Sequence, residues 1–276
     1  MINFATIAGE LLPFRHGNVN QTFKALVATS DGRVPVAAII KDLPVKELFN
    51  ELISFLILKD LGLPVPDTYL GLVPAGNRQI SKGPLLPDGA RLVLASKDVG
   101  SPNLKFVTNL SDLSSEAEAK ACLSRFVPEL AKWGKFGEMY AFDTWVANVD
   151  RNLGNVLFGG TKPDGSVDVW VIDHGQALTS EMWQPNDLIP EGSYMNKLQI
   201  WAVPFLTDDN KSTCLGSLQL FEIKAHALDK RSKVEYLSKM FGLDDASKNA
   251  VTNFLELRLA EVSGQCRTAL MVETMI

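Results

Sequence analysis

The chain has 276 residues, of which 46% are hydrophobic and 21% are charged, and its formal net charge is −5. This length suits one large domain or two lobes around a cleft, and the composition excludes a generally disordered chain. The acidic balance, with no cluster of four or more basic residues, argues against direct binding to nucleic acid or to an anionic membrane.

The cysteines and the beginning of the chain indicate where the protein resides. Three cysteines, far apart and without a CxxC pair, argue against a disulfide framework or a cysteine-ligated zinc site. The first residues, MINFATIAGELL, lack the basic region and apolar stretch of a secretory signal. No uncharged apolar run approaches the roughly 18 residues that span a bilayer. We therefore expect a cytoplasmic protein with no membrane association.

The first hundred residues predict a β-rich region with one helix. The runs at 23–29 and 34–41 are rich in β-forming residues, and an Asp-Gly pair between them favours a tight hairpin turn. The segment 46–61 carries apolar residues at helical spacing and is followed by a glycine and two prolines, which predict its end. The run 91–97 is a further predicted strand.

After about residue 98 the sequence pattern becomes helical. Helices are predicted over 115–134 and 136–149, and Pro128 predicts a kink or a break in the first. A long amphipathic helical segment is predicted from 244 to about 270, because two aspartates provide a good helix start there.

A second β-hairpin interrupts this helical region. It is predicted from strands at 155–158 and 167–172, which flank another Asp-Gly turn. The elements together predict an α+β fold of two lobes. The first, residues 1–98, is β-rich with one helix; the second, residues 99–276, is mainly helical and contains the short hairpin. Ligands tend to lie in the cleft between two such lobes.

The residues around the second hairpin are suited to phosphate chemistry. Asp150 precedes the hairpin, Asn155 stands where its first strand begins, and Asp173 follows its second strand. A carboxylate and an amide oxygen suit Mg²⁺ held jointly with phosphate groups. A second carboxylate nearby can accept the proton of an attacking hydroxyl.

These motifs resemble those of the protein-kinase-like superfamily, in which an Asp-x-x-x-x-Asn loop, a β-hairpin and an Asp-x-Gly loop follow one another. The loop DRNLGN at 150–155 is similar to the DRHxGN loop of phosphatidylinositol kinases and of the HipA-like kinases of bacteria. Together with VWVIDHGQA, it most resembles the short HipA-like kinase domain, over roughly residues 20–180.

The resemblance implies a protein-kinase-like fold that uses ATP and Mg²⁺. It implies that Asp150 is the catalytic base or the carboxylate that orients the hydroxyl, and that Asn155 and Asp173 hold Mg²⁺. The sequence departs from the family at Asn152, which stands where the DRH triplet has its histidine. His174 replaces the metal-loop phenylalanine of protein kinases, a change expected in this branch, and a packing role suits it better than proton transfer.

A kinase also needs a cation on the α- and β-phosphates, and a carboxylate on a helix positions that cation. Lys41 ends the strand VPVAAIIK, as the VAIK-type lysine ends its strand. Glu51 lies ten residues further on, in the helix that follows. We expect an ion pair between Lys41 and Glu51, with Glu47, one turn earlier on the same face, as the alternative carboxylate.

Two further segments are candidates for nucleotide binding. Backbone groups at the end of the 91–97 strand are expected to hold adenine, at Ser96, Lys97 and Asp98. No GxGxxG motif occurs, and the candidate for the phosphate-covering loop is the segment 16–24. Its candidate binding residues are Gly17, Asn18 and Asn20.

Three features leave alternatives open. Arg151, next to the catalytic aspartate, either braces the loop through a carboxylate or approaches a phosphate. Trp201, in the run QIWAVPFL, is either buried in the core, which is the favoured alternative, or part of a surface for a substrate or partner. Hydroxyl groups at Thr22 and in the stretch 108–115 are candidates for autophosphorylation.

The predicted function is therefore that of an ATP- and Mg²⁺-dependent phosphotransferase acting on a hydroxyl group. The resemblance implies a serine or threonine protein kinase with catalytic residues Asp150, Lys41, Glu51 and Arg151. It also implies a protein substrate and, for a toxin of a toxin–antitoxin system, an antitoxin partner. The alternatives are a lipid or small-molecule kinase, a nucleotide-binding pseudokinase, and an enzyme that transfers the nucleotide instead of the phosphate.

Overall fold

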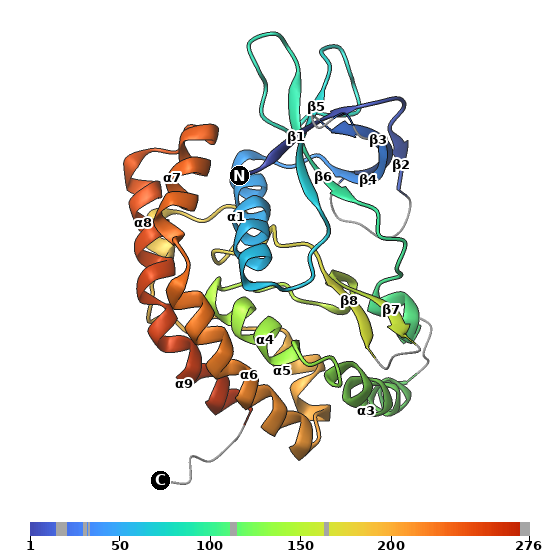
Figure 1. Cartoon of the computed structure of the whole chain (residues 1–276), viewed down its shortest axis with the longest axis vertical. Coiled ribbons are helices and arrows are strands. Elements are labelled where there is room, and N and C mark those ends of the chain that lie inside the picture. The colour runs from blue at the N-terminus through green and yellow to red at the C-terminus, as the bar shows by residue number, and fades with distance from the viewer. Residues whose placement is uncertain (15–20, 30–31, 33, 111–114, 163–165, 271–276) are drawn as a thin grey trace.

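The structure combines a curved β-sheet with a larger helical part, and Figure 1 shows the sheet at one end of the molecule and most of the helices at the other. It is a computed structural model that describes residues 1–14, 21–29, 32, 34–110, 115–162 and 166–270. No helix among these residues is long and apolar enough to cross a membrane.

The sheet is formed by six strands from the first hundred residues. These are β1 (Asn3–Ile7), β2 (Leu12–Pro13), β3 (Thr22–Thr29), β4 (Val36–Lys41), β5 (Thr68–Val73) and β6 (Arg91–Lys97). Their order is β1-β5-β6-β4-β3-β2, and β1 also pairs with β3. Because β1 pairs with β5 on one side and with β3 on the other, the sheet closes on itself.

Alternation along the closed sheet separates two hydrophobic cores. One face of the strands fills the inside of the closed sheet, with Phe23, Val27, Ile40 and Val93 among its buried residues. The other face contributes to the main core of the molecule through residues such as Leu94. Helix α1 (Val45–Leu61) belongs to that main core and contacts both β6 and the helical part. The position of α1 is thus fixed from both sides.

The remainder of the chain is mainly helical. Its helices are α2 (Leu104–Thr108), α3 (Glu116–Ala131), α4 (Phe136–Trp145), α5 (Leu198–Trp201), α6 (Asp208–Ala227), α7 (Lys230–Phe241), α8 (Asp245–Leu257) and α9 (Leu259–Ala269). Helix α4 is buried along its whole length and packs against α6 and α9. Strands β7 (Val156–Thr161) and β8 (Val167–Val171) follow α4 and pair antiparallel.

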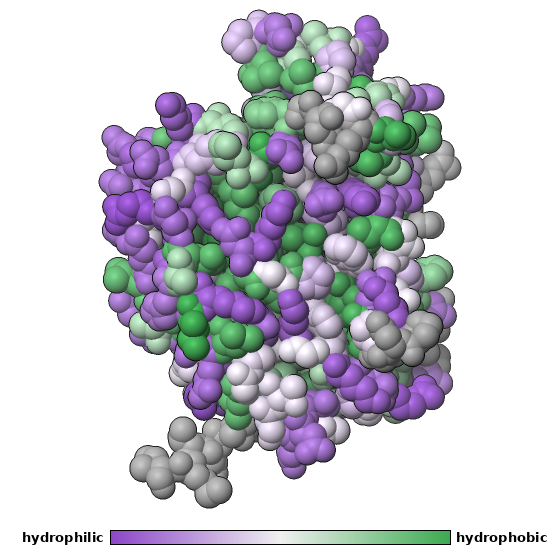
Figure 2. Space-filling view, in the orientation of Figure 1, coloured by the Kyte–Doolittle hydropathy of each residue, from purple (hydrophilic) through white to green (hydrophobic). Residues whose placement is uncertain are grey.

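The outer helices are amphipathic. Helices α7 and α8 bury Val234, Leu237, Val251 and Phe254. Figure 2 shows mainly hydrophilic side chains on the surface over these two helices. Their apolar faces therefore close the main core, and their polar faces meet the solvent.

The observed elements agree with the predicted ones in some places and differ from them in others. Strand β6 has the predicted bounds, and α3 runs through Pro128 without a break. The expected helix at 136–149 ends at Trp145, and Ala147 then has a left-handed backbone with φ of 47°. The long segment from 244 divides into α8 and α9 at Arg258, whose buried guanidinium binds the carbonyls of Thr144, Pro190 and Gly192.

Some predicted features are not tested. Both Asp-Gly hairpin turns include residues outside the described part of the chain, at 30–31 and 33 and at 163–165. The division of the chain at residue 98 also stays a prediction. The main core includes residues from both sides of this position, such as Leu94 and Trp145.

Candidate active site

Lys41 connects three separate elements of the structure. Its side chain leaves the end of β4 on the outer face of the sheet and is 15% exposed. The ammonium nitrogen Nζ lies 2.7 Å from Oε1 of Glu51 on α1 and 3.0 Å from Oδ1 of Asp173, which follows β8. The expected Lys41–Glu51 ion pair is therefore present, and Asp173 joins it. Glu47, the alternative carboxylate, packs closely against Gly175. A Cβ atom added to Gly175 would lie only 2.8 Å from Cγ of Glu47.

Burial and charge act in opposite directions on these three groups. Burial lowers the pKa of Lys41, but the charges of Asp173 and Glu51 raise it, and the net pKa lies above its usual value. Burial raises the pKa of Glu51, and the Lys41 charge only partly offsets this rise. Burial also acts to raise the pKa of Asp173, but Lys41 and Arg151 lower it below its usual value. Lys41 and Asp173 are thus held in their charged forms.

Asn50, the residue before Glu51, fixes α1 to the segment after Asp173. Its buried amide donates hydrogen bonds to the carbonyls of Gly175, Ala177 and Ser180, at 2.8 to 2.9 Å. Its amide oxygen accepts a hydrogen bond of 2.9 Å from the Trp183 indole N–H. Because the two N–H groups of this amide are shared among three carbonyls and its oxygen accepts a further hydrogen bond, the position of Glu51 is coupled to the segment that carries Asp173.

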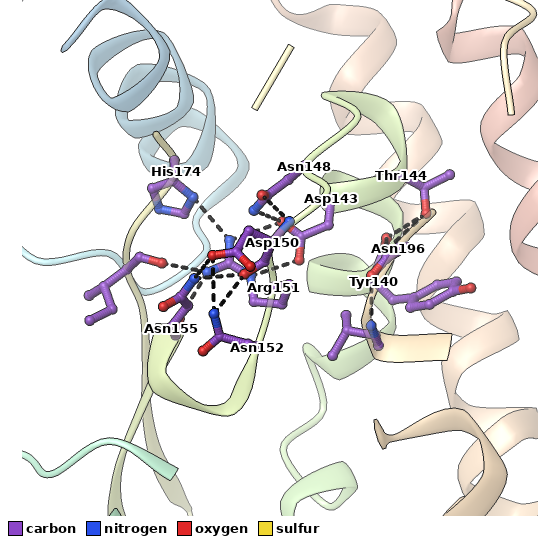
Figure 3. A network of polar contacts seen from close by, with 12 residues as sticks. Tyr140, Asp143, Thr144, Asn148, Asp150, Arg151, Asn152, Asn155, His174 and Asn196 are labelled. Carbon is purple, nitrogen blue, oxygen red and sulfur yellow. Dashed lines mark hydrogen bonds and ion pairs between the residues drawn. The ribbon is translucent and has the colours of Figure 1, made fainter. Parts of the chain in front are cut away.

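Arg151 lies at the centre of the polar network in Figure 3 and is fully buried. Its Nε and Nη2 atoms donate to the two carboxylate oxygens of Asp143 on α4, at 2.8 and 2.9 Å. Nη1 donates to the carbonyls of Asn155, at 2.8 Å, and of Ile172. Of the two roles left open by the sequence, this geometry is that of a brace, because the fully buried guanidinium contacts a carboxylate and two carbonyls. These contacts favour a positioning role, while a catalytic role for Arg151 stays a prediction from the sequence.

Asp150 stands next to this brace with its carboxylate partly exposed. Oδ2 accepts hydrogen bonds from the amides of Asn152, at 3.1 Å, and Asn155, at 3.4 Å. Oδ1 pairs with the ammonium group of Lys197. The Asp150 backbone N–H donates to Oδ1 of Asn148 at 3.2 Å. Side chains rather than regular secondary structure thus hold the carboxylate in place.

Asn152 stands where the similar DRHxGN loop has its histidine, and it has a local structural role. Its amide donates to the carbonyl of Asp150 at 3.3 Å as well as to the Asp150 carboxylate. Its amide oxygen accepts a hydrogen bond of 2.7 Å from the N–H of Gly154. The departure at this position is therefore compatible with an ordered loop.

Asn155 and Asp173 have the donor atoms that a divalent cation needs. The Asn155 amide nitrogen donates to the Asp150 carbonyl at 2.7 Å, so the amide oxygen faces another direction as an acceptor. The side chain of Asp173 is 44% exposed, and its backbone is left-handed with φ of 60°. The N–H of Ile172 donates to the carbonyl of Asn155, which keeps the two segments adjacent. A carboxylate and an amide oxygen at such a site fit Mg²⁺.

His174 is a packing residue in this structure. It is buried, and its ring meets the ring of Phe142 edge to face at 5.9 Å. Burial, with the charges of Arg151 and Lys41, lowers the pKa of His174 well below its usual value. The neutral ring receives a hydrogen bond from Arg151 at Nδ1, 3.0 Å from Nη2. Proton transfer by this enclosed side chain is therefore disfavoured, as the sequence indicated.

The segment expected to hold adenine is only partly free to do so. The N–H groups of Lys97 and Asp98 already donate to the carbonyls of Asp67 and Ala37. The Ser96 hydroxyl bonds to that of Thr68 at 3.1 Å. The Asp98 carboxylate pairs with Lys24 at 2.9 Å. Adenine would therefore have to bind to other groups of this segment, because these two N–H groups already have acceptors. The phosphate-loop candidates lie outside the described residues; they are Gly17, Asn18 and Asn20.

Sequence reasoning did not single out Asp143 or Lys197. Asp143 is one of two buried carboxylates in the otherwise apolar α4, the other being Glu138, and a buried acidic residue in such a run signals a cationic partner. Lys197 lies 47 residues after Asp150 and belongs to no recognisable motif. Trp201 is buried, as favoured from the sequence, and its indole N–H donates to the Arg151 carbonyl at 2.8 Å.

The arrangement of strands and helices is similar to that of a solved kinase. A solved structure with this fold is the proinflammatory kinase CtkA of Helicobacter pylori, which aligns with a TM-score of 0.59 over 96% of this chain and 98% of that chain. The two chains are 17% identical, so the likeness is one of fold. No protein-family model and no curated protein matches the sequence.

Proposed function

We propose that this protein is an ATP- and Mg²⁺-dependent phosphotransferase of two-lobed, protein-kinase-like architecture, with its active site at the Lys41–Asp150–Asp173 cluster. The observation that carries the proposal is the contact of the Lys41 ammonium with both Glu51 and Asp173. A largely enclosed lysine held by a helix carboxylate, beside a partly exposed carboxylate that follows a hairpin, is the arrangement that protein kinases use for phosphoryl transfer. A kinase fold is compatible with it.

Each residue of the cluster has a distinct role in this proposal. Lys41 binds the α- and β-phosphates, and Glu51 keeps its ammonium group in place. Asn155 and Asp173 would hold Mg²⁺, which when bound supplies positive charge to the phosphates. Asp150 orients the acceptor hydroxyl and takes its proton as the oxygen attacks the γ-phosphorus. The bond from the γ-phosphorus to the bridging oxygen breaks, and its electron pair leaves with ADP.

The acceptor that we propose is a serine or threonine hydroxyl on a protein. This part of the proposal comes from the resemblance of DRNLGN and VWVIDHGQA to HipA-like kinases. A toxin role and an antitoxin partner belong to the same proposal, and nothing in the contacts of the cluster bears on them. Thr22, a candidate for autophosphorylation, is buried at the start of β3 with 8% exposure, and the stretch 108–115 includes residues outside the described part of the chain.

The test is transfer of label from γ-labelled ATP in the presence of Mg²⁺ and host-cell lysate. The wild type is compared with Asp150→Asn and with Asp168→Asn as the matched control. Asp168, on the β7–β8 hairpin, has a carboxylate paired with a surface lysine, Lys162, at 3.5 Å. Label in a protein band with the wild type and the control, lost with Asp150→Asn, is the expected result.

Other outcomes favour other functions. Label confined to a lipid or small-molecule fraction indicates a kinase of that class. Transfer only from α-labelled ATP indicates a nucleotide-transferring enzyme. No transfer from a chain that still binds ATP indicates a pseudokinase and contradicts the proposed function. Removal of Mg²⁺ with EDTA is expected to stop transfer both by a lipid or small-molecule kinase and by a nucleotide-transferring enzyme.

A further inference from the structure

The carboxylate of Asp150 has a cationic partner that comes from a distant part of the sequence. Lys197 immediately precedes α5, and its ammonium group pairs with Oδ1 of Asp150. Both side chains are partly exposed, Lys197 at 41% and Asp150 at 33%. An exposed lysine would gain little from this contact alone, because surface ion pairs contribute about 0–1 kcal/mol.

Buried anchors on both sides hold Lys197 at this place. Asn196, which is 2% exposed, donates to the Tyr140 carbonyl at 3.3 Å and to the Thr144 hydroxyl at 3.2 Å, both on α4. Figure 3 shows Asn196 beside these two residues. On the other side, the Trp201 indole donates to the carbonyl of Arg151, next to Asp150. The turn is thus tied both to α4 and to the catalytic loop, and the lysine is preorganised.

The other cations of the cluster are already committed. Arg151 is fully buried and spends its donors on Asp143 and on carbonyls. Lys41 is bound between Glu51 and Asp173. Asn152, which stands on the catalytic loop where the similar kinases have a histidine, is neutral and supplies no cation. Among the residues that the structure describes, Lys197 is therefore the cation that combines direct contact with Asp150 and substantial exposure to an incoming ligand.

We propose that Lys197 is a further catalytic residue, whose ammonium group contacts the oxygens of the γ-phosphoryl group during its transfer. This inference rests on the proposed function. As the acceptor oxygen bonds to phosphorus and its proton passes to Asp150, the bond to the bridging oxygen breaks and ADP leaves. Negative charge on the three outer oxygens of the phosphoryl group is then stabilised by Lys197, which stays protonated throughout.

The test compares Lys197→Met and Lys197→Arg with the wild type. Lys132→Met serves as the matched control, since Lys132 pairs with Glu129 on the surface of α3 at 2.8 Å. Two quantities are measured on the purified full chain. One is the single-turnover loss of γ-phosphate from Mg²⁺-ATP, with dephosphorylated casein added as acceptor. The other is the affinity for ADP and for the non-hydrolysable ATP analogue AMP-PNP, by competition with a fluorescent nucleotide.

A contact with the γ-phosphoryl group should affect only measurements that include this group. Lys197→Met is expected to slow γ-phosphate loss about 10²-fold, as for removal of one donor to a developing charge. It should weaken AMP-PNP binding about tenfold, the effect of 1.4 kcal/mol, and leave ADP binding unchanged. Lys197→Arg should recover a large share of the rate, and Lys132→Met should match the wild type.

Three results overturn this inference. The first is an unchanged rate with Lys197→Met, and the second is equal weakening of ADP and AMP-PNP binding. The third is loss of the folded state in Lys197→Met together with full wild-type behaviour of Lys197→Gln, since glutamine lacks the charge. Failure of the proposed function differs from all three, because the wild type itself would then consume no γ-phosphate. The comparison of AMP-PNP with ADP would still decide whether Lys197 contacts the γ-phosphoryl group.

Discussion

The proposed active site is supplied by two regions that position their charged groups in different ways. In the region of β4 and α1, the backbone does this: Lys41 is fixed by the pairing of β4 with β3 and β6, and Glu51 by its place in a helix. In the region of the catalytic loop, individual side chains do it. The Asp150 carboxylate is bonded by Asn152, by Asn155 and by Lys197 of the anchored turn before α5, and Arg151 in turn holds the carbonyl of Asn155.

This difference has a consequence for the effects of substitution. A neighbour of Lys41 on β4 can change without moving Lys41, because the strand register depends on backbone hydrogen bonds. A side chain that binds the catalytic loop cannot change in this way, because its loss leaves a buried partner without a hydrogen bond. The two regions should therefore respond differently to conservative substitutions, and three experiments test this.

The largest effect is expected from Arg151→Met in the catalytic-loop region. The substitution leaves the buried carboxylate of Asp143 without its cation and should cost about 3–5 kcal/mol of the free energy of unfolding. Phosphoryl transfer should be lost as well, because the carbonyls of Asn155, at the end of the loop, and of Ile172, next to Asp173, lose their donor. Chemical denaturation of the full chain measures the first effect. The control is Arg231→Met, since Arg231 forms an exposed pair with Glu256 at 3.2 Å. Equal stability of the two variants would contradict the role of Arg151 as a brace.

Lys41→Met should affect activity more than stability. We expect phosphoryl transfer to fall about 10²–10³-fold, because a charge that contacts the phosphates is removed. The fold should survive, since Glu51 can take up a proton; burial already raises its pKa. Initial rates with γ-labelled ATP and thermal melting measure the two effects. A loss of stability as large as that of Arg151→Met would show that the β4–α1 region is not the more tolerant one.

The same difference explains what the sequence could predict. The sequence could single out candidates that each belong to a short motif on one predicted element: Lys41, Glu51, Asp150, Asn155 and Asp173. The contacts of Lys197 could not be identified, because they depend on how a turn 47 residues away is anchored. Closure of the sheet was also not predicted, since it requires the five-residue strand β1 to pair with both β3 and β5. Local patterns predict elements and motifs, but they contain no information on such long-range pairing.

The smallest effects, and the sharpest comparison, are expected from Trp201→Phe and Ile40→Val. Trp201→Phe removes the indole donor and leaves the Arg151 carbonyl without this hydrogen bond, at a cost of about 1–3 kcal/mol. Ile40 is fully buried inside the closed sheet next to Lys41, and its shortening to valine costs about 0.5–1.5 kcal/mol. The two variants should thus melt at similar temperatures.

Their activities should nevertheless differ. Trp201→Phe loosens the turn that holds Lys197 against Asp150, and a small displacement there should slow phosphoryl transfer on the order of tenfold. Ile40→Val leaves the hydrogen bonds of β4 intact and should transfer phosphate at the wild-type rate. Rates measured well below both melting temperatures separate the two cases. If both variants are equally active, the turn does not control the position of Lys197; if Ile40→Val is the slower, the register of β4 does not protect Lys41 from changes in the packing beneath it.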